Sequence, residues 1–487
     1  MNTHTQSVTF HNSPARQRQE FTPLEPGRVT LYTCGPTVYN YLHVGNWVAY
    51  VRWDMLVRTL ELSGYKVERV MNITDVGHLT GENEGDADQG EDKLEKGARR
   101  EGKTAWEVAK MYTDDFLAGM QALALLPPQH ITKATDYIPQ QIALVKTLEE
   151  KGFTYIISDG VYFDTAEFPR YAEFAQLDLK ALQEGARVTA NPEKRNASDF
   201  AVWKFSPKDA KRDMEWDSPW GTGFPGWHLE CSAMAMDILG ETIDIHTGGI
   251  DHIPVHHTNE IAQSEAASGR QFVRYWLHNA HLLAEGTKIS KSLGNGFTLQ
   301  DIAKEGYSPL DFKMFVLQSH YRTESNFSWQ NLAAAAARLS NWREFAVLRW
   351  QAEGGDDAKL SALIDEAWAA ITKALQNDLD TPEALRHTDE IAGKLKAATP
   401  AQLPKHRLAA FIAQLDKAFG LQLEQNTPDI TKAGQTLLDE RQTALQNKDW
   451  DTSDQLRASL RDDHGIIVRD IQQDGNKRQL WSWTGSK

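Results

Sequence analysis

Residues 28–73 read RVTLYTCGPTVYNYLHVGNWVAYVRWDMLVRTLELSGYKVERVMNI, and the order of patterns in this stretch decides the fold class. Arg28 to Cys34 alternates and is rich in β-forming residues, which predicts a strand. The stretch from Gly45 onward predicts a long helix, and Lys66 to Ile73 predicts a second strand. Strand, helix and strand in this order predict a β-α-β unit with a parallel sheet. Because ligands of such sheets bind outside the carboxyl ends of the strands, residues 34–46 are expected at the ligand site.

The composition is that of a folded protein with several domains. The chain has 487 residues, 41% of them hydrophobic and 24% charged. At about 100 to 200 residues per domain, this length predicts two to four domains. No uncharged apolar run approaches the ~18 residues that span a bilayer, and the start MNTHTQSVTF lacks the pattern of a signal peptide. We therefore expect a cytoplasmic protein that does not bind a membrane.

The charge balance limits the nucleic-acid functions. Lysine and arginine number 52 against 67 aspartates and glutamates, which gives 52 − 67 = −15. Non-specific affinity for nucleic acid comes chiefly from basic side chains that release counterions. The balance therefore argues against a protein that coats nucleic acid, but it leaves room for one specific nucleic acid bound by a local basic track.

Shifts in pattern along the chain predict an α/β protein with a Rossmann-type parallel-sheet catalytic domain. A hairpin-like stretch, YIISDGVYFDT, lies in a segment of about a hundred residues that separates two α/β stretches. Heptad-like helices follow Ser328, one of them with an Asp380 or Thr381 cap and Pro382 in its first turn. The tail predicts two helices and a short strand pair. The predicted ranges are 1–125 and 226–327 for the two halves of the catalytic domain, 126–225 for an inserted subdomain, 328–425 for an α-helical bundle and 426–487 for a small C-terminal domain.

Two short motifs predict a nucleotide site. In HVGN, His43 lies at the end of a strand-to-helix loop, Gly45 permits close approach and Asn46 stands at the helix start, where backbone N–H groups and the helix dipole favour a phosphate. In KISKS, Lys288 and Lys291 could close over a polyphosphate and neutralise the charge on a leaving pyrophosphate. Each motif alone is weak, but the two together, about 240 residues apart, make a nucleotide site the better interpretation.

Four further residues predict a metal site. His256 and Glu260 are spaced i and i+4 in a stretch that predicts a helix, so both should project from one face. Cys231 follows an FPG turn early in a predicted helix, where the dipole helps to stabilise a thiolate. Cys34 ends the first strand. Two thiolates, an imidazole and a carboxylate make a tetrahedral zinc site, and these are the only two cysteines in the chain.

The motifs CGPTVYNYLHVGN, PGWHLECSAM, HHTNEIAQS and KISKSLGN together closely resemble the signatures of the class I cysteinyl-tRNA synthetases. The resemblance runs over nearly the whole chain. It includes TPEALR, which is similar to the DALR-type helical domain of that family, and the tail KDWDTSDQLRASLRDDHGIIVRD, which is similar to its anticodon-binding end.

The resemblance implies a cysteine–tRNA ligase with ATP, L-cysteine and tRNA(Cys) as partners, magnesium with the ATP, one zinc per chain and a monomeric state. The amino-acid carboxylate would attack the α-phosphorus of ATP, and a terminal ribose hydroxyl of the tRNA would then take the acyl group. Zinc binds thiolate much better than hydroxyl, so it would select cysteine over serine without an editing domain.

Residue roles follow from the same resemblance. Cys34, Cys231, His256 and Glu260 match the zinc ligands, and Lys291 matches the lysine that contacts ATP. The other matched positions are Thr74 and Trp227 near the substrate cysteine, and Gly249 with Asp251 at the adenosine site. Four histidines, at positions 228, 246, 252 and 257, carry little information singly and are left as structural or nucleotide-adjacent.

The sequence departs from the family at two places. Asn46 stands where the family usually has a second histidine, so its catalytic role is less secure than that of His43. The acidic, Gly-rich stretch from Gly81 to Asp92 is an insertion beside the expected active site. It is interpreted either as a solvated surface loop or as a lid or acceptor-selecting element.

Two other functions remain open from the sequence. A cysteine ligase that uses an amino sugar or another small amine would have no use for the roughly 160 residues after Ser328. A non-catalytic paralogue that binds nucleotide or zinc would be expected to have lost His43 or Lys291, and both are present.

Overall fold

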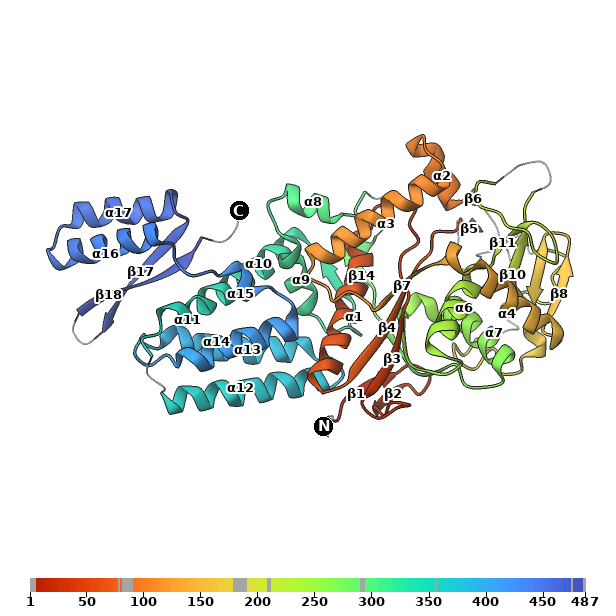
Figure 1. Cartoon of the computed structure of the whole chain (residues 1–487), viewed down its shortest axis with the longest axis horizontal. Helices are drawn as coiled ribbons and strands as arrows, with labels where there is room; N and C mark the ends of the chain where they lie inside the picture. The colour runs from red at the N-terminus through yellow and green to blue at the C-terminus, as the bar shows by residue number, and fades with distance from the viewer. Residues whose placement is uncertain are drawn as a thin grey trace.

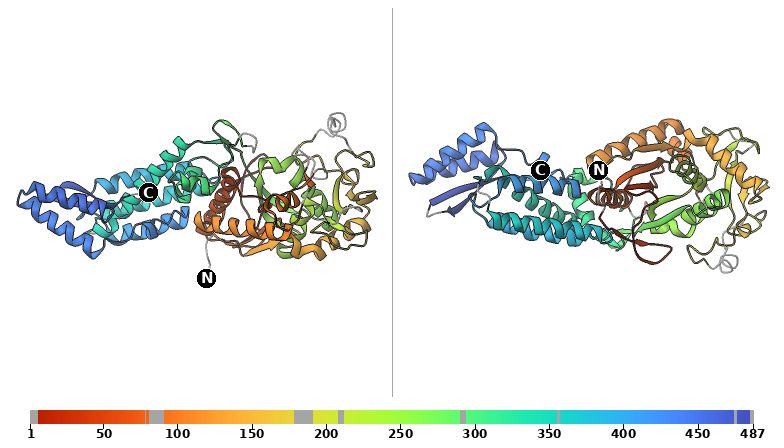
Figure 2. Two further views of the ribbon diagram at one scale, coloured as in Figure 1. Left: turned by 90° about the horizontal axis from the view of Figure 1, so that it is seen from above. Right: turned by 60° about the horizontal axis from the view of Figure 1, so that its bottom comes forward.

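The structure is a computed structural model of the chain, and it describes residues 6–77, 79–80, 91–177, 191–207, 212–289, 294–354, 357–473 and 476–484. Figure 1 shows an elongated molecule, with a sheet-based half that contains the N-terminus and a helical half that ends in a small C-terminal unit. The two further views in Figure 2 show the same division. The acidic stretch 81–90 and the segment 290–293 with Lys291 lie outside the described residues.

A five-stranded parallel sheet forms the centre of the first half, so the α/β class predicted from the sequence is confirmed. Its strands lie in the order β13-β12-β3-β4-β7. Strand β3 (Arg28–Thr33) pairs in parallel with β4 (Lys66–Ile73), and helix α1 (Val44–Leu62) connects them. The bounds agree with the predicted β-α-β unit to within a residue at each strand. Strands β12 (Ile243–Gly249) and β13 (Val273–Asn279) continue the sheet beside β3.

The fifth strand departs from the predicted division of the chain. Strand β7 (His130–Lys133) pairs with the outer edge of β4. The main sheet therefore extends past residue 125, where the first half of the catalytic domain was predicted to end. The five domain ranges otherwise stay a prediction.

An antiparallel sheet follows β7 in the chain and lies at the far end of the sheet-based half (Figure 1). Its strands are β8 (Thr154–Ile157), β9 (Gly160–Phe163), β10 (Phe200–Phe205) and β11 (Gly223–Pro225), in the order β11-β10-β9-β8. Strands β8 and β9 are the hairpin predicted from YIISDGVYFDT. Helix α4 (Ile138–Glu150) packs against this unit and against α6 (Trp227–Leu239).

The remaining elements of the first half surround the two sheets. They are β1 (Thr9–Asn12), β2 (Gln17–Glu20), β5 (Leu79–Thr80), β6 (Glu91–Asp92), α2 (Lys93–Glu101), α3 (Ala105–Ala122), α7 (Thr258–Ser268), β14 (Leu282–Ala284), β15 (Thr287–Lys288), α8 (Leu299–Lys304), α9 (Pro309–Leu317) and β16 (Ser325–Phe327). Short helical turns lie at Ala134–Tyr137, Thr165–Glu167, Ile250–His252 (η3) and Ile253–His257 (η4).

The second half is a helical bundle followed by a small α/β unit. The bundle contains α10 (Trp329–Ala346), α11 (Leu348–Gln351), α12 (Ala358–Gln376), α13 (Thr381–Ala397), α14 (Lys405–Phe419) and α15 (Leu423–Asn426). Helix α13 begins after Asp380, whose side chain accepts a hydrogen bond from the N–H of Glu383. The last unit contains α16 (Lys432–Gln446), α17 (Trp450–Asp462) and the hairpin β17 (Ile466–Gln473) with β18 (Asn476–Trp483), the two helices and strand pair predicted for the tail.

The two halves share a hydrophobic core. Buried residues of α1, α3 and α9 belong to the same cluster as those of α10, α12, α13 and α14. Among the described residues, no helix combines the length and the apolarity that crossing a membrane requires.

A buried ionic joint reinforces this contact. Asp54 of α1 lies between Arg58, at 2.7 Å, and Lys313 of α9, at 2.9 Å. Arg58 also donates to the carbonyls of Asp416 and Lys417 at the end of α14. We call Asp54, Arg58 and Lys313 the α1 joint. Gly420 closes it, because a Cβ at this position would lie 2.4 Å from Nη2 of Arg58, and its φ of +62° suits glycine.

Candidate active site and metal centre

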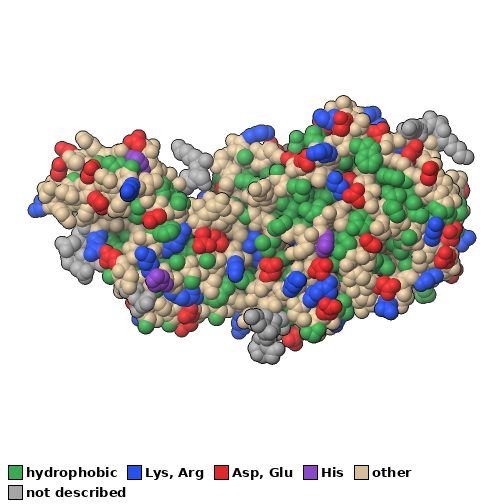
Figure 3. Space-filling view, in the orientation of Figure 1, with side chains coloured by type: hydrophobic (Ala, Val, Ile, Leu, Met, Phe, Trp, Pro, Cys, Tyr) green, Lys and Arg blue, Asp and Glu red, His purple; other side chains and the backbone are tan. Residues whose placement is uncertain are grey.

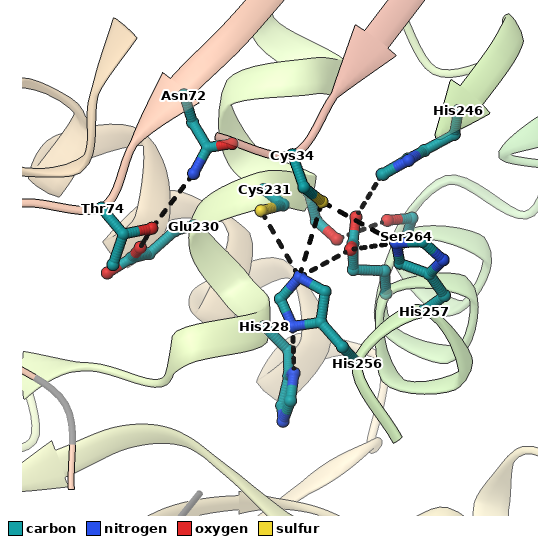
Figure 4. Close-up of polar contacts among 12 residues, drawn as sticks. Cys34, Asn72, Thr74, His228, Glu230, Cys231, His246, His256, His257 and Ser264 are labelled. Carbon is teal, nitrogen blue, oxygen red and sulfur yellow. Dashed lines mark hydrogen bonds and ion pairs between the residues drawn. The ribbon is translucent and has the colours of Figure 1, made fainter. Parts of the chain in front are cut away.

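Four side chains predicted as metal ligands lie together beside the end of β3, and Figure 4 labels three of them, Cys34, Cys231 and His256. Cys34 follows β3, Cys231 lies on α6, His256 lies in η4 and Glu260 lies on α7. One ligand atom from each lies within 4.8 Å of the others. Segments more than 220 residues apart in the sequence therefore form one cluster, which we call the thiol cluster.

The distances in the thiol cluster suit a tetrahedral ion. Zinc bonds of about 2.0–2.3 Å place the ligand atoms of a tetrahedron about 3.5 Å apart. Nε2 of His256 lies 3.6 Å from Sγ of Cys231, 3.9 Å from Sγ of Cys34 and 3.0 Å from Oε1 of Glu260. The donor set of two sulfurs, one nitrogen and one oxygen fits zinc.

A second set of donors overlaps the first. Cys34, His246, His257 and Glu260 also bring one ligand atom each within 4.8 Å of the others. Nε2 of His257 lies 3.7 Å from Sγ of Cys34 but 3.9 Å from Oε1 of Glu260. This set contains a single thiol, and zinc favours the set with two.

The local backbone around His256 differs from the prediction. His256 was expected on the same α-helix as Glu260, but it lies in the π-helical turn η4, and α7 begins only at Thr258. Pro254, in the first turn of η4, cannot donate a backbone hydrogen bond. The wider turn still presents both side chains to the same point, because Nε2 of His256 lies 3.0 Å from Glu260. Such π turns are frequent at functional sites.

Histidines surround the thiol cluster on its buried side. His246 of β12 donates from Nε2 to Oε2 of Glu260 at 2.9 Å. His228 of α6 lies 2.8 Å from His256, Nδ1 to Nδ1. His257 and His278 lie 2.7 Å apart. These contacts orient the side chains that face the cluster, as outer partners orient the ligands of known metal sites.

The pKa values of the two thiols depend on the contact between them and on burial, and both values are shifted upward. The hydrogen bond between the cysteines lowers the pKa of Cys34, but burial and the carboxylates of Glu260 and Asp251 raise it more, so the net shift is upward. The pKa of Cys231 is raised well above its usual range by the hydrogen bond with Cys34 and by burial. A metal ion at the cluster would therefore have to displace protons from sulfur.

The Glu260 carboxylate is the anionic member of the cluster. Burial raises its pKa, but His246 and His256 lower it more, and the net shift is downward. Glu260 in turn raises the pKa of His256 against the effect of burial. The buried Oε1 of Glu260 lies 3.0 Å from Nε2 of His256, but within the described part of the chain no donor meets it with good hydrogen-bond geometry. An atom of this kind, facing two thiols, is suited to a cation.

The two residues predicted near the substrate lie beside the cluster. The Trp227 ring, at the start of α6, is centred 4.9 Å from the His256 ring. Thr74, buried after β4, donates from Oγ1 to Glu230 at 3.2 Å and accepts from Nδ2 of Asn72 at 3.0 Å. Figure 4 shows this chain of polar side chains next to Cys231. Thr74 therefore contacts α6 through Glu230, and Trp227 contacts the thiol cluster through His256.

Gly35 makes the approach of these segments possible. A Cβ at Gly35 would lie 1.6 Å from the carbonyl oxygen of Asn72, so any other residue would push the strand ends apart. The N–H of Gly35 donates to Oδ1 of Asn72 at 2.8 Å. Cys34 and Thr74 are thus held at neighbouring strand ends by one glycine and one asparagine.

The two nucleotide motifs lie side by side. The N–H of Val44 donates to the carbonyl of Phe297 at 2.7 Å, and His43 forms a bridge with Thr298. Gly45 faces the second motif, since a Cβ there would lie 2.8 Å from Cδ1 of Ile289. The segments predicted to hold one nucleotide thus meet, although 240 residues separate them. Lys288 is described and exposed in β15, whereas Lys291 lies outside the described residues.

The structure gives Asn46 a capping contact. Its Oδ1 accepts a hydrogen bond from the N–H of His43 at 3.2 Å, at the start of α1. Gly249 ends β12, and a Cβ there would lie 2.2 Å from Oδ1 of Asp251, which is exposed. The roles of these three residues toward ATP stay predictions.

The sequence reasoning missed the histidine layer and the pair of Asn72 with Glu230. Four of those histidines were set aside singly, and His278 was not considered. A signal was present, because seven of the sixteen histidines of the chain fall within residues 228–281. Glu230 and Asn72 had no comparable signal, because their contact with Thr74 joins β4 to α6.

Two family models match the chain. The model of the tRNA synthetases class I (C) catalytic domain matches residues 20–337, and that of the Cysteinyl-tRNA ligase anticodon binding domain matches residues 427–481.

Curated relatives match over nearly the full length. The chain is 43% identical to Cysteine–tRNA ligase 1 of Burkholderia lata over 93% of both chains. It is 38% identical to the cysteine–tRNA ligase of Treponema denticola, over 95% of this chain and 98% of the relative. The match to that of Novosphingobium aromaticivorans is 40% over 98% and 97%.

Solved structures share the fold at low identity. A methionyl-tRNA synthetase of Mycobacterium tuberculosis with methionyl-adenylate superposes with a TM-score of 0.57, at 14% identity, over 82% of this chain and 92% of that one. A LeuRS in a ternary complex with tRNA and LeuAMS, from Agrobacterium radiobacter, gives 0.59 at 11% identity over 95% and 91%.

Proposed function

The chain belongs to the class I cysteinyl-tRNA synthetases, and on this premise we propose how its residues divide the work of charging tRNA(Cys) with L-cysteine. The enzyme uses ATP and proceeds through cysteinyl adenylate. The cysteine carboxylate attacks the α-phosphorus of ATP, the bond to pyrophosphate breaks, and a terminal ribose hydroxyl of the tRNA then displaces AMP. Positioning and charge stabilisation supply most of the catalysis in such reactions.

The thiol cluster is the observation that carries the proposal. Cys34, Cys231, His256 and Glu260 would hold one zinc ion, and the buried Oε1 of Glu260 supports this choice of ligands. When bound, zinc would supply a Lewis acid that favours the thiolate of the substrate over a serine hydroxyl. His246 would fix the orientation of Glu260 through its 2.9 Å hydrogen bond.

Thr74 and Trp227 would position the substrate cysteine. Thr74 is 2% exposed, and its hydroxyl is held by Asn72 and Glu230, so it offers a fixed polar group at the end of β4. Trp227, 4.9 Å from the His256 ring, would wall the side chain and exclude water. A fixed polar group and an aromatic ring beside the thiol cluster suit an amino acid with a short side chain.

His43, Gly45 and Asn46 would bind the phosphates at the start of α1. Helix N-termini favour anions, and the Asn46 cap keeps the first turn in place. Gly249 and Asp251 would contact the adenosine, and Lys288 with Lys291 would neutralise the charge that develops on pyrophosphate. Magnesium would accompany the ATP.

The C-terminal half would bind the tRNA at a distance from the chemistry. The match of residues 427–481 to an anticodon-binding family supports tRNA over a small amine as the acceptor. We expect a monomer in the cytoplasm, because one chain contains both the nucleotide motifs and the tRNA-binding units.

One pair of assays tests the proposal. Exchange of labelled pyrophosphate into ATP should depend on cysteine and not on serine, and the same preparation should charge tRNA(Cys). Exchange without charging would favour the small-amine ligase, and absence of both would leave a non-catalytic paralogue. As an internal check, His43→Ala should reduce exchange by about 100-fold or more without loss of metal, because His43 lies outside the thiol cluster.

A further inference from the structure

Tyr41 is an exposed aromatic residue at the rim of the candidate active site. It lies in the connection between β3 and α1, two residues before His43, and 48% of its surface is exposed. Two residues span at most about 7 Å of chain, so the Tyr41 backbone lies within this distance of His43. This exposed ring therefore lies next to the nucleotide motif.

The Tyr41 ring packs against α3. It meets the ring of Tyr112 of α3 edge-to-face, with centroids 5.0 Å apart and planes at 88°. Tyr112 is 3% exposed, and its hydroxyl donates to Glu101 at 3.0 Å and accepts from Nη2 of Arg100 at 2.9 Å. Arg100 also donates to the carbonyl of Tyr39 at 3.1 Å. Tyr41 is therefore a supported ring with an open side.

Helix α2, which places Arg100 beside Tyr112, is basic although the protein is acidic. Helix α2, KLEKGARRE, contains four basic and two acidic residues, so its formal charge is 4 − 2 = +2 in a chain of net charge −15. The Arg100 side chain is 43% exposed. In Figure 1, α2 projects beside α3, and Figure 3 shows hydrophobic side chains gathered on the face over α3, with both basic and acidic side chains near them.

We propose that Tyr41, supported by Tyr112 and flanked by Arg100, is a stacking platform for the unpaired 3′ end of the tRNA. This inference rests on the proposed function and identifies a contact made in its second step. The terminal ribose must reach the adenylate beside His43, so the preceding nucleotides have to cross the rim where Tyr41 lies. An exposed aromatic ring with a neighbouring arginine is the combination that binds single-stranded nucleic acid, since every base can stack on such a ring.

The test separates the two reaction steps in the full-length protein. Tyr41→Ala should leave cysteine-dependent pyrophosphate exchange within about twofold of the parent, because Tyr41 lies outside the residues assigned to cysteine and ATP. Single-turnover transfer from preformed adenylate to tRNA should slow by about tenfold or more. Tyr41→Phe keeps the ring and should restore transfer. Ile156→Ala, which removes an equally exposed apolar side chain (56%) from β8, should change neither step.

Binding of a shortened tRNA completes the experiment. A tRNA that lacks its unpaired 3′ nucleotides should bind the parent and Tyr41→Ala equally, whereas intact tRNA should bind the variant less tightly. Equal transfer rates in parent and Tyr41→Ala would overturn the proposal, and so would an equal loss of exchange and transfer, which would make Tyr41 a residue that shapes the HVGN loop. Weaker binding of both tRNAs would place the contact elsewhere. A parent that exchanges pyrophosphate but charges no tRNA would refute the proposed function itself.

Discussion

The α1 joint and the thiol cluster are both buried and ionisable, but they balance their charges differently. In the α1 joint, Asp54 and Lys313 are both 0% exposed, and the carboxylate has two cations within 3 Å. Burial raises the pKa of Asp54, but Lys313 and Arg58 lower it more, so the net shift is downward. Backbone carbonyls of Ala124, Asp416 and Lys417 accept further hydrogen bonds from Arg58 and Lys313. The carboxylate of the joint is therefore paired with cations of the chain.

The thiol cluster is built from different groups. The pKa values of both thiols are raised, and the Glu260 carboxylate is flanked by two histidines, His246 at 2.9 Å and His256 at 3.0 Å. Its sulfur, nitrogen and oxygen atoms are of the kinds that bind a metal cation. The comparison teaches that burial of charge alone does not identify a functional site. The informative feature is a cluster of thiol, imidazole and carboxylate atoms that lie close enough together to share one metal ion.

Removal of the joint's only carboxylate should have the largest effect on the free energy of unfolding. Asp54→Asn leaves Arg58 and Lys313 buried without their anion, and we expect a loss of about 3–5 kcal/mol, measured by urea unfolding. Asp114→Asn removes the carboxylate of an exposed pair with Lys110 and should change stability by less than about 1 kcal/mol. A loss for Asp54→Asn as small as that of the control would remove the distinction between the two regions.

In contrast to Asp54→Asn, Cys231→Ser should have a small effect on the free energy of unfolding and a large effect on the binding of zinc and cysteine. We expect about one zinc per chain in the parent and none in the variant, as measured by metal analysis. The variant's affinity for cysteine should fall by about 100-fold or more while that for ATP stays within about threefold, because ATP is assigned to other residues. A folded, active parent without zinc would contradict the assignment of the cluster.

Substitution of His246, which contacts a predicted zinc ligand, should weaken zinc binding less than Cys231→Ser does. His246→Ala removes the hydrogen bond to Oε2 of Glu260 and should weaken zinc affinity by about 10- to 100-fold, measured by competition with a chelator. His130→Ala, at a partly exposed histidine near Glu68, is the matched control and should leave zinc affinity unchanged. If both variants hold zinc equally well, His246 only fills space.

A fall in pH should weaken zinc binding at the thiol cluster before it weakens the α1 joint, and the change per pH unit should be smaller than the effects of the substitutions above. Zinc must replace protons on thiols whose pKa values are raised, so its affinity should fall by about tenfold or more per unit between pH 8 and 6. Asp54, whose pKa is lowered below the unfolded value of 3.8, stabilises the fold above that pH and loses its contribution only as pH falls through the folded pKa. Zinc affinity that stays constant over pH 6–8 would mean that the thiols are already ionised.

The sequence predicted the elements that are formed by residues close together in the chain. The strands β3 and β4 with α1 between them, the hairpin of β8 and β9 and the tail helices were predicted because periodicity and turn residues are local. The four donors of the thiol cluster were also predicted and lie together, although their role toward zinc stays untested.

Contacts between distant segments were not predicted. The ion pair of Asp54 with Lys313 joins residues 259 apart, and neither position has a distinctive local pattern. The π-helical turn at His256 escaped prediction because a one-residue change in helical spacing leaves the same polar pattern in the sequence. Strand β7, four residues long, was assigned to the inserted subdomain because only its partner β4 reveals its place.

Helix α1 connects the nucleotide motif at its start with the α1 joint in its second half. Its nineteen residues measure about 28 Å, with His43 at one end and, toward the other, the joint that grips α9 and α14. The joint lies about 18 Å along the helix from Val44, so a tilt of about 3° pivoted at the joint would displace the start of α1 by about 1 Å. Misplacement on this scale can cost a reaction about a hundredfold. The contacts of α1 with the helical bundle therefore help to fix the position of His43 at the nucleotide site. A side chain added at Gly420, far from every substrate, would be read in an assay as a defect of catalysis.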